Sequence, residues 1–214
     1  GGNYNTVVGD EAGTAITTGD YNTAVGYAAL DANTTGTQNT AVGTDALSTN
    51  TAGNNSTGIG YKALLTNTGA SNTATGSHSL VNNTTGTQNT ASGGFSLYSN
   101  TTANYNTAHG YYTLFSNTTG ASNVAVGYQA LDANTTASYN TAVGYESLGA
   151  NTTGASNVGA GYETLYLNTT GSNNVAFGRA SMYTNTTGSN NVAVGHDSLK
   201  SNTTGTENLA AGFN

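Results

Sequence analysis

The sequence contains no cysteine, no proline and no tryptophan, and only 6% of its residues are charged. Without cysteine, neither disulfide bonds nor thiolate metal sites can form. Three Lys and Arg residues stand against ten Asp and Glu, a net charge of −7, so the basic surface that a nucleic-acid backbone requires is missing. No apolar run reaches the 18 or more residues of a membrane-spanning helix. We therefore expect no nucleic-acid partner and no membrane span.

What the sequence does contain is a strict repeat, marked by a glycine after a small apolar triplet. The steps between these glycines are 17 residues, except for a 16-residue step from Gly60 to Gly76, where Thr68-Gly69 lacks a second threonine. A period this regular is typical of a solenoid. With no linker or shift in composition, residues 1–214 are predicted to be a single continuous array. Because the chain begins inside a repeat, we expect it to be a segment of a longer protein. The glycines are Gly9, Gly26, Gly43, Gly60, Gly76, Gly93, Gly110, Gly127, Gly144, Gly161, Gly178, Gly195 and Gly212.

Numbered from the residue four places before this glycine, the consensus is N-[TV]-A-V-G-Y-x-[AS]-L-x-x-N-T-T-G-x-x. Positions 2 and 4 carry Thr or Val and share one face of an extended strand, which we expect to form the core. Position 3 lies on the opposite face and is nearly always Ala or Gly. A strand face turned to water has no reason to exclude larger polar residues. We therefore predict that an oligomer partner or a second sheet packs on this alanine face, represented by Ala125, Ala142, Ala176 and Ala193.

The rest of the repeat predicts the other side of the coil. Leucine at position 9, as in Leu131 and Leu148, is expected in a return strand that packs against the valines. The N-T-T-G segment is expected to form a corner whose stacked Asn and Thr side chains hydrogen-bond between coils. Thr75, Ser92 and His109 replace the valine at position 4 in succession, which predicts a locally weaker core.

Asn, Thr and Gly at these densities are poor helix formers. The prediction is therefore an all-β protein, a parallel β-solenoid (β-roll) of about thirteen 17-residue coils. At about 4.8 Å per coil, such an array would be a rod of roughly 60 Å.

The strand motif resembles a known class of fibrous proteins. Ser122-Asn123-Val124-Ala125-Val126-Gly127 and Asn190-Asn191-Val192-Ala193-Val194-Gly195 resemble the N-S-V-A-I-G strand of trimeric autotransporter adhesin heads. The longer form N-T-A-V-G-Y-x-A-L-x-x-N-T-T-G is similar to repeats of phage-type tail-fibre and bacterial surface-fibre proteins. The resemblance implies a fibrous extracellular shaft or head, but names no receptor. The repeat is about three residues longer than the adhesin-head unit, and the excess falls in the corner.

No arrangement of residues predicts an enzyme, and we expect neither a catalytic site nor a metal or other cofactor. His78, His109 and His196 fall at repeat positions 7, 4 and 6 in different turns, far from any triad or metal-ligand spacing. The acidic residues follow no calcium-loop pattern.

Tyrosine at position 6 recurs in four consecutive coils as Tyr111, Tyr128, Tyr145 and Tyr162. Two interpretations are open. The rings can form a structural ladder along an edge, or a strip that contacts sugar rings or another fibre.

Position 12 begins an N-x-T sequon in nine coils, which also leaves two interpretations open. The asparagines can be an unmodified turn ladder, or they can carry one glycan per coil if the chain is secreted through a glycosylating pathway. The candidate attachment sites are Asn33, Asn83, Asn100, Asn117, Asn134, Asn151, Asn168, Asn185 and Asn202.

Regular threonine rows raise ice binding as a further possibility. Thr152 and Thr153, at positions 13 and 14, are neighbours in sequence and would point to opposite sides of an extended chain, so a flat threonine face is not evident there.

We therefore predict a structural or adhesive segment of an extracellular fibre on a cell or virion surface. It would self-associate as a homotrimer or filament and offer multivalent contacts to glycans or a host surface. A glycan-coated filament subunit and an ice-binding solenoid are the alternatives.

Overall fold

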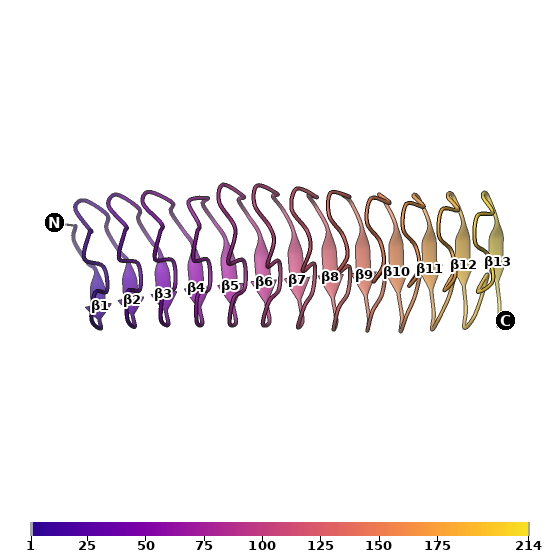
Figure 1. The fold of residues 1–214 in the computed structure, drawn as a ribbon, viewed down its shortest axis with the longest axis horizontal. Coiled ribbons are helices and arrows are strands. Elements are labelled where there is room, and N and C mark those ends of the chain that lie inside the picture. The colour runs from indigo at the N-terminus through magenta and orange to yellow at the C-terminus, as the bar shows by residue number, and fades with distance from the viewer. Residues whose placement is uncertain (1, 214) are drawn as a thin grey trace. The chain divides into compact units, whose positions relative to one another are not determined.

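The computed structural model describes residues 2–213, which form thirteen three-residue β-strands and, within that range, no helix. The chain divides into two compact units, Gly1–Asn106 and Thr107–Asn214. Figure 1 labels the strands of both units. The first unit contains β1 (Thr6–Val8), β2 (Thr23–Val25), β3 (Thr40–Val42), β4 (Thr57–Ile59), β5 (Thr73–Thr75) and β6 (Thr90–Ser92). The second contains β7 (Thr107–His109), β8 (Val124–Val126), β9 (Thr141–Val143), β10 (Val158–Ala160), β11 (Val175–Phe177), β12 (Val192–Val194) and β13 (Leu209–Ala211).

Within each unit, every strand pairs in parallel with the strand of the next coil, and each repeat position pairs with its own copy. Ala24 lies beside Ala41, and Ala125 beside Ala142. The 16-residue coil keeps this register, since Thr57 pairs with Thr73 and Ile59 with Thr75. The predicted parallel β-solenoid is confirmed.

The middle residue of each strand points into the coil, which reverses the predicted assignment of the two strand faces. The four alanines expected to form an oligomer face, Ala125, Ala142, Ala176 and Ala193, have no exposed surface within the single chain. Their partner is the leucine column. A Cβ added at Gly159 would lie 3.5 Å from Leu148 Cδ1 and 2.8 Å from the Ser147 hydroxyl of the preceding coil. The restriction to small residues was a correct signal of close packing, but the packing is internal.

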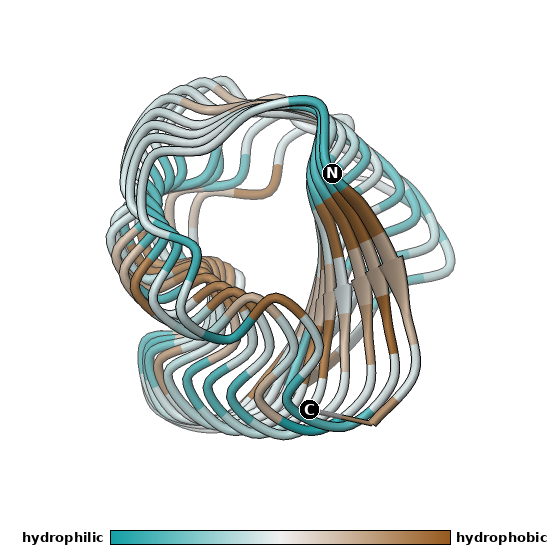
Figure 2. Ribbon diagram, turned by 90° about the vertical axis from the view of Figure 1, so that its right-hand side faces the viewer, coloured by the Kyte–Doolittle hydropathy of each residue, from teal (hydrophilic) through white to brown (hydrophobic). Residues whose placement is uncertain are grey.

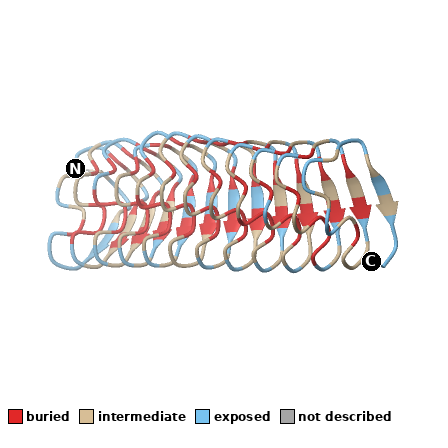
Figure 3. Ribbon diagram, turned by 45° about the vertical axis from the view of Figure 1, so that its right-hand side comes forward, coloured by how far each residue is buried: buried red, intermediate tan, exposed pale blue. Residues whose placement is uncertain are grey.

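The residues at positions 2 and 4 therefore face outward, and the expectation that they form the core is wrong. Val8, Val143 and Val194 are 58%, 41% and 44% exposed. Thr75, Ser92 and His109 occupy the same outward row, so they place no polar atoms in the core and do not weaken it as expected. Figure 3 shows the buried segments recurring at equivalent places in successive coils.

The leucine at position 9 is fully buried in nine coils, but it lies in a turn and not in a return strand. Its φ is positive, +55° in Leu148 and +54° in Leu131. Left-handed backbone costs roughly 1–2 kcal/mol in a residue with a Cβ. Burial of a leucine side chain contributes about 1.5–3 kcal/mol, which offsets that cost. In the end-on view of Figure 2, brown hydrophobic segments lie both in the strands and in the turns on the other side of the coil.

The glycine that marks the repeat has a conformational reason to recur. In Gly127 φ is +130°, and an added Cβ would lie 2.4 Å from the Gly144 carbonyl oxygen of the next coil. No side chain fits this close backbone contact, so the position after each strand is glycine in every coil.

Candidate functional site

The buried face of the corner is built from a ladder of asparagine side chains at position 12. The Asn151 amide nitrogen donates to Asn134 Oδ1 at 3.1 Å and to the Gly154 carbonyl at 2.9 Å. The Asn151 Oδ1 accepts from Asn168 Nδ2 at 2.8 Å. Both amide hydrogens and the amide oxygen of Asn151 are therefore used, and this side chain, which has no exposed surface, bonds its coil to the coils on both sides.

A second asparagine ladder, at position 1, is built on the same carbonyls. The Asn157 amide nitrogen donates to the Gly171 carbonyl at 2.8 Å, and the same carbonyl accepts from Asn168 Nδ2 at 2.9 Å. The backbone N–H of Asn174 donates to Asn157 Oδ1 at 2.9 Å. Two buried amides from different parts of one coil thus meet at one backbone oxygen and close the corner.

These ladders overturn the glycan interpretation of the N-x-T sequons. Eight of the nine candidate acceptors have no exposed surface: Asn33, Asn83, Asn100, Asn117, Asn134, Asn151, Asn168 and Asn185. The ninth, Asn202, is partly buried, and its nitrogen donates to Asn185 Oδ1 at 2.9 Å and to the Gly205 carbonyl at 3.1 Å. A glycan on Nδ2 would replace one of the two bonded hydrogens and fill space occupied by the chain. The sequons are structural asparagines in this fold.

The threonines at position 13 also complete the corner. The Thr152 hydroxyl donates to the Thr169 carbonyl of the next coil at 3.0 Å, and the Thr169 hydroxyl to Thr186 at 3.1 Å. These hydroxyls are committed to bonds between coils, so the corner offers no free row of threonine hydroxyls at this position.

The predicted tyrosine strip does come together. Tyr111, Tyr128, Tyr145 and Tyr162 are 42–47% exposed, and their ring centroids follow one another at 6.2, 5.3 and 5.2 Å with nearly parallel planes. The Arg179 guanidinium continues the row at 5.8 Å from the Tyr162 ring centroid. Because each ring face is turned toward the next ring, the strip presents mainly ring edges and hydroxyls. The stacking supports the structural interpretation of the row.

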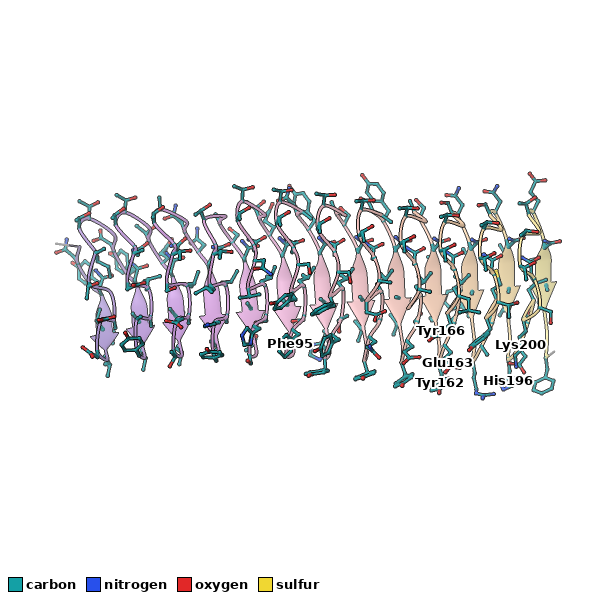
Figure 4. All side chains as sticks on the ribbon, in the orientation of Figure 1. Phe95, Tyr162, Glu163, Tyr166, His196 and Lys200 are labelled. Carbon is teal, nitrogen blue, oxygen red and sulfur yellow. The ribbon has the colours of Figure 1, made fainter. Side chains whose placement is uncertain are left out.

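Acidic residues lie beside this tyrosine row. A hydrogen bond to Glu146, together with burial, raises the pKa of the Tyr145 hydroxyl, and Glu163 has the same effect on the pKa of Tyr162. Figure 4 shows Tyr162, Glu163 and Tyr166 along the same edge of the coils.

A small hollow lies near the tyrosine row. It forms at Gly149, which occupies a repeat position that carries a larger side chain in the neighbouring coils. The hollow has a volume of about 190 Å³, and its lining includes Asp132, Glu146 and Tyr166. Burial, with a smaller contribution from the nearby charge of Glu146, raises the pKa of Asp132 to about 6. The charged form of Asp132 is thus disfavoured in the folded state.

The three histidines are not brought together. His78 stacks on Phe95 with ring centroids 5.0 Å apart, and His196 stacks on Phe213 at 4.9 Å. His109 lies at the end of β7. Among residues 2–213, no three His, Asp or Glu side chains are grouped so that they could hold a metal ion. In the same range, no helix is long and apolar enough to cross a membrane.

The surface that sequence reasoning missed is the outward strand face, because positions 2 and 4 were assigned to the core. In β1–β6, position 2 is threonine in every strand. In β8–β13, the same position is Val or Leu in all strands except β9. The sequence did contain an indication of the correct assignment. Position 3 is restricted to small residues because it faces the inside of the coil, and positions 2 and 4 of the same strand must then face solvent.

No family model matches the sequence, and no curated protein or solved structure shows significant similarity to it.

Loss of one amide should show how much the buried ladder stabilises the fold. Replacing Asn151 with Ala leaves the Gly154 carbonyl, Asn134 Oδ1 and Asn168 Nδ2 each short of a bond. Since an unsatisfied buried polar group costs about 1–3 kcal/mol, we expect a loss of roughly 3 kcal/mol or more in unfolding free energy. Urea denaturation of the whole chain measures the change in unfolding free energy. Hydrogen exchange of amides in the second unit shows whether the loss lies in the coils around Asn151. Thr153→Ala, at an exposed corner position, is the matched control. Equal effects of the two substitutions would contradict the ladder's role.

Asp132 predicts a pH dependence of stability. Its pKa is raised in the folded protein, so the folded state binds its proton more tightly, and stability falls as pH rises from about 4 to about 6. Asp132→Asn should therefore raise the melting temperature at pH 7.5 and have little effect near pH 4. Allowing for the partial exposure of Asp132, a gain of about 1 kcal/mol corresponds to roughly 2–4 °C. Glu207→Gln, which neutralises an exposed carboxylate, controls for net charge. A gain of the same size at both pH values would refute the assignment.

Proposed function

We propose that this chain is a structural segment of an extracellular fibre, in which stacked coils provide a rigid body and outward side chains provide contacts. The observation that carries the proposal is the pair of buried asparagine ladders. They bond neighbouring coils to one another through fully buried side chains such as Asn134, Asn151 and Asn168.

Two properties of the ladders suit a fibre. The bonds run between coils, along the direction in which the coils stack, so the interactions that stabilise the fold also hold it together along its length. The same two asparagines and one threonine recur in most coils, as in Asn151, Asn157 and Thr152. Repetition of this kind suits a part whose task is mechanical.

Surface labelling of intact cells or particles that make the chain tests the fibre role. Antibodies against exposed epitopes around Tyr105 and Tyr139, which are 58% and 68% exposed, should decorate external filaments in electron micrographs without permeabilisation. Antibody preabsorbed with the purified chain is the control. Label that appears only after permeabilisation, or off any filament, would overturn the proposal.

Ice binding is the second candidate function, and a different observation favours it. The threonines at position 2 of β1–β6 form an outward row in registered adjacent strands. None of their hydroxyls donates to or accepts from another described residue, unlike the hydroxyls at position 13 of the corner. The row comprises Thr6, Thr23, Thr40, Thr57, Thr73 and Thr90. A registered row of free hydroxyls and methyls is a surface that could order water.

Thermal hysteresis and the shape of growing ice crystals test this second candidate. The purified chain should shape ice, and Thr40→Lys with Thr73→Lys should abolish the effect because both side chains lie within the row. Thr153→Lys with Thr187→Lys, which adds the same charge at the corner, should leave it intact. Absence of ice shaping by the unmodified chain would eliminate the candidate.

A further inference from the structure

The outward face of β8–β13 is largely apolar and free of charge, in contrast to the threonine row of β1–β6. Val143, Phe177 and Val194 are 41%, 44% and 44% exposed. Two rows make up this face, which we call the valine face. Position 2 contributes Val124, Thr141, Val158, Val175, Val192 and Leu209, and position 4 contributes Val126, Val143, Ala160, Phe177, Val194 and Ala211.

We propose that the valine face binds a second copy of this chain, face to face, about a two-fold axis that is parallel to the strands and passes between β10 and β11. The inference deepens the proposed fibre role, because it names a lateral contact between segments. The dimer is tested with purified chains in solution. Its test is therefore independent of the test for an extracellular location.

The spacing of the face favours another β-sheet as the occupant. Its side chains recur at the inter-strand distance of about 4.8 Å along the stack, and facing sheets pack about 10 Å apart with interdigitated side chains. A second copy presents the same spacing in the same two rows. The face has no charged group that would select a charged partner.

The sizes of the side chains favour this two-fold arrangement. The axis places each strand opposite a different strand of the second copy, β10 opposite β11, β9 opposite β12 and β8 opposite β13. In the position 4 row, Phe177 then lies over Ala160 of the second copy, Val143 over Val194, and Val126 over Ala211. The largest side chain of the row thus meets one of the smallest. In an isologous interface each such pair occurs twice.

The area of the face predicts a weak association. A strand contributes a patch of roughly 50 Å² at these spacings. Six strands give about 300 Å² per copy and about 600 Å² in total, below the roughly 1,200 Å² of a stable specific complex. Two negatively charged chains also repel each other at low salt, and screening reduces that repulsion. We expect dimers at high concentration that become more populated as salt is added.

Exchanging the large and small side chains tests the geometry. Phe177→Ala leaves a gap opposite Ala160, and Ala160→Phe brings two phenylalanines together, so each single substitution should weaken dimerisation by about tenfold. The double variant Ala160→Phe, Phe177→Ala restores a large residue opposite a small one and should restore dimerisation. Sedimentation equilibrium up to millimolar chain at high salt measures all four proteins.

A charge test locates the face independently of packing. Val143→Lys with Val194→Lys should abolish the dimer, although it lowers the net negative charge. Thr153→Lys with Thr187→Lys makes the same change in charge at the corner and should dimerise at least as well as the unmodified chain. Circular dichroism confirms that each variant is folded, and the milder Val143→Thr, Val194→Thr pair replaces the lysine pair if folding is lost.

Three results would overturn the inference. An unmodified chain that stays monomeric at millimolar concentration has no such interface. A lysine variant that dimerises normally places the contact elsewhere. A double exchange variant that stays as weak as its single parents excludes the two-fold pairing of Ala160 with Phe177.

Discussion

The buried amide is the constraint on which the rest of this structure depends. A side-chain amide enclosed in protein must have its donors and acceptor satisfied, since each one left unpaired is costly. In the corner of each coil, only the adjacent coil can supply the missing partner, as Asn134 does for Asn151 and Asn151 for Asn168. Coils must therefore stack in register, and register in turn aligns every other row. The leucine column, the tyrosine stack and the outward strand rows all inherit their regularity from this requirement.

Architecture was largely predictable from the repeat, but the direction of the strand faces was not. Period, β-propensity and the corner composition correctly indicated a parallel solenoid with hydrogen-bonded ladders. The alternation of side chains in a three-residue strand divides them into two faces without saying which is buried, and hydrophobicity suggested the valines. The alanines are buried instead, because a small residue leaves room for leucine inside the coil, as the contact distances of Gly159 show.

Backbone conformation was the other part that sequence reasoning missed. Leucine is a poor indicator of a left-handed residue, yet Leu148 has a φ of +55°. One coil carried the signal, since Gly13 occupies the leucine position with a φ of +55°. A glycine substituted into a conserved apolar position of a repeat is thus informative about φ in all copies. The glycan interpretation of the sequons failed for a different reason. An N-x-T motif specifies residue types but does not indicate whether the asparagine is buried.

The 16-residue coil shows how the repeat length is controlled. Thr68-Gly69 lacks one residue, but Thr57 and Thr73 remain paired, and the Asn83 amide still reaches Asn67 Oδ1 at 2.7 Å. The Asn67 amide nitrogen, however, donates to the Gly69 carbonyl at 2.7 Å and not to the preceding coil, so the buried Asn50 Oδ1 has no hydrogen-bond partner. Strand pairing therefore keeps the coils in register across one missing rung of the asparagine ladder. A one-residue loss in the corner is thus absorbed locally, because strand pairing and the amide ladder are two separate means of keeping neighbouring coils aligned.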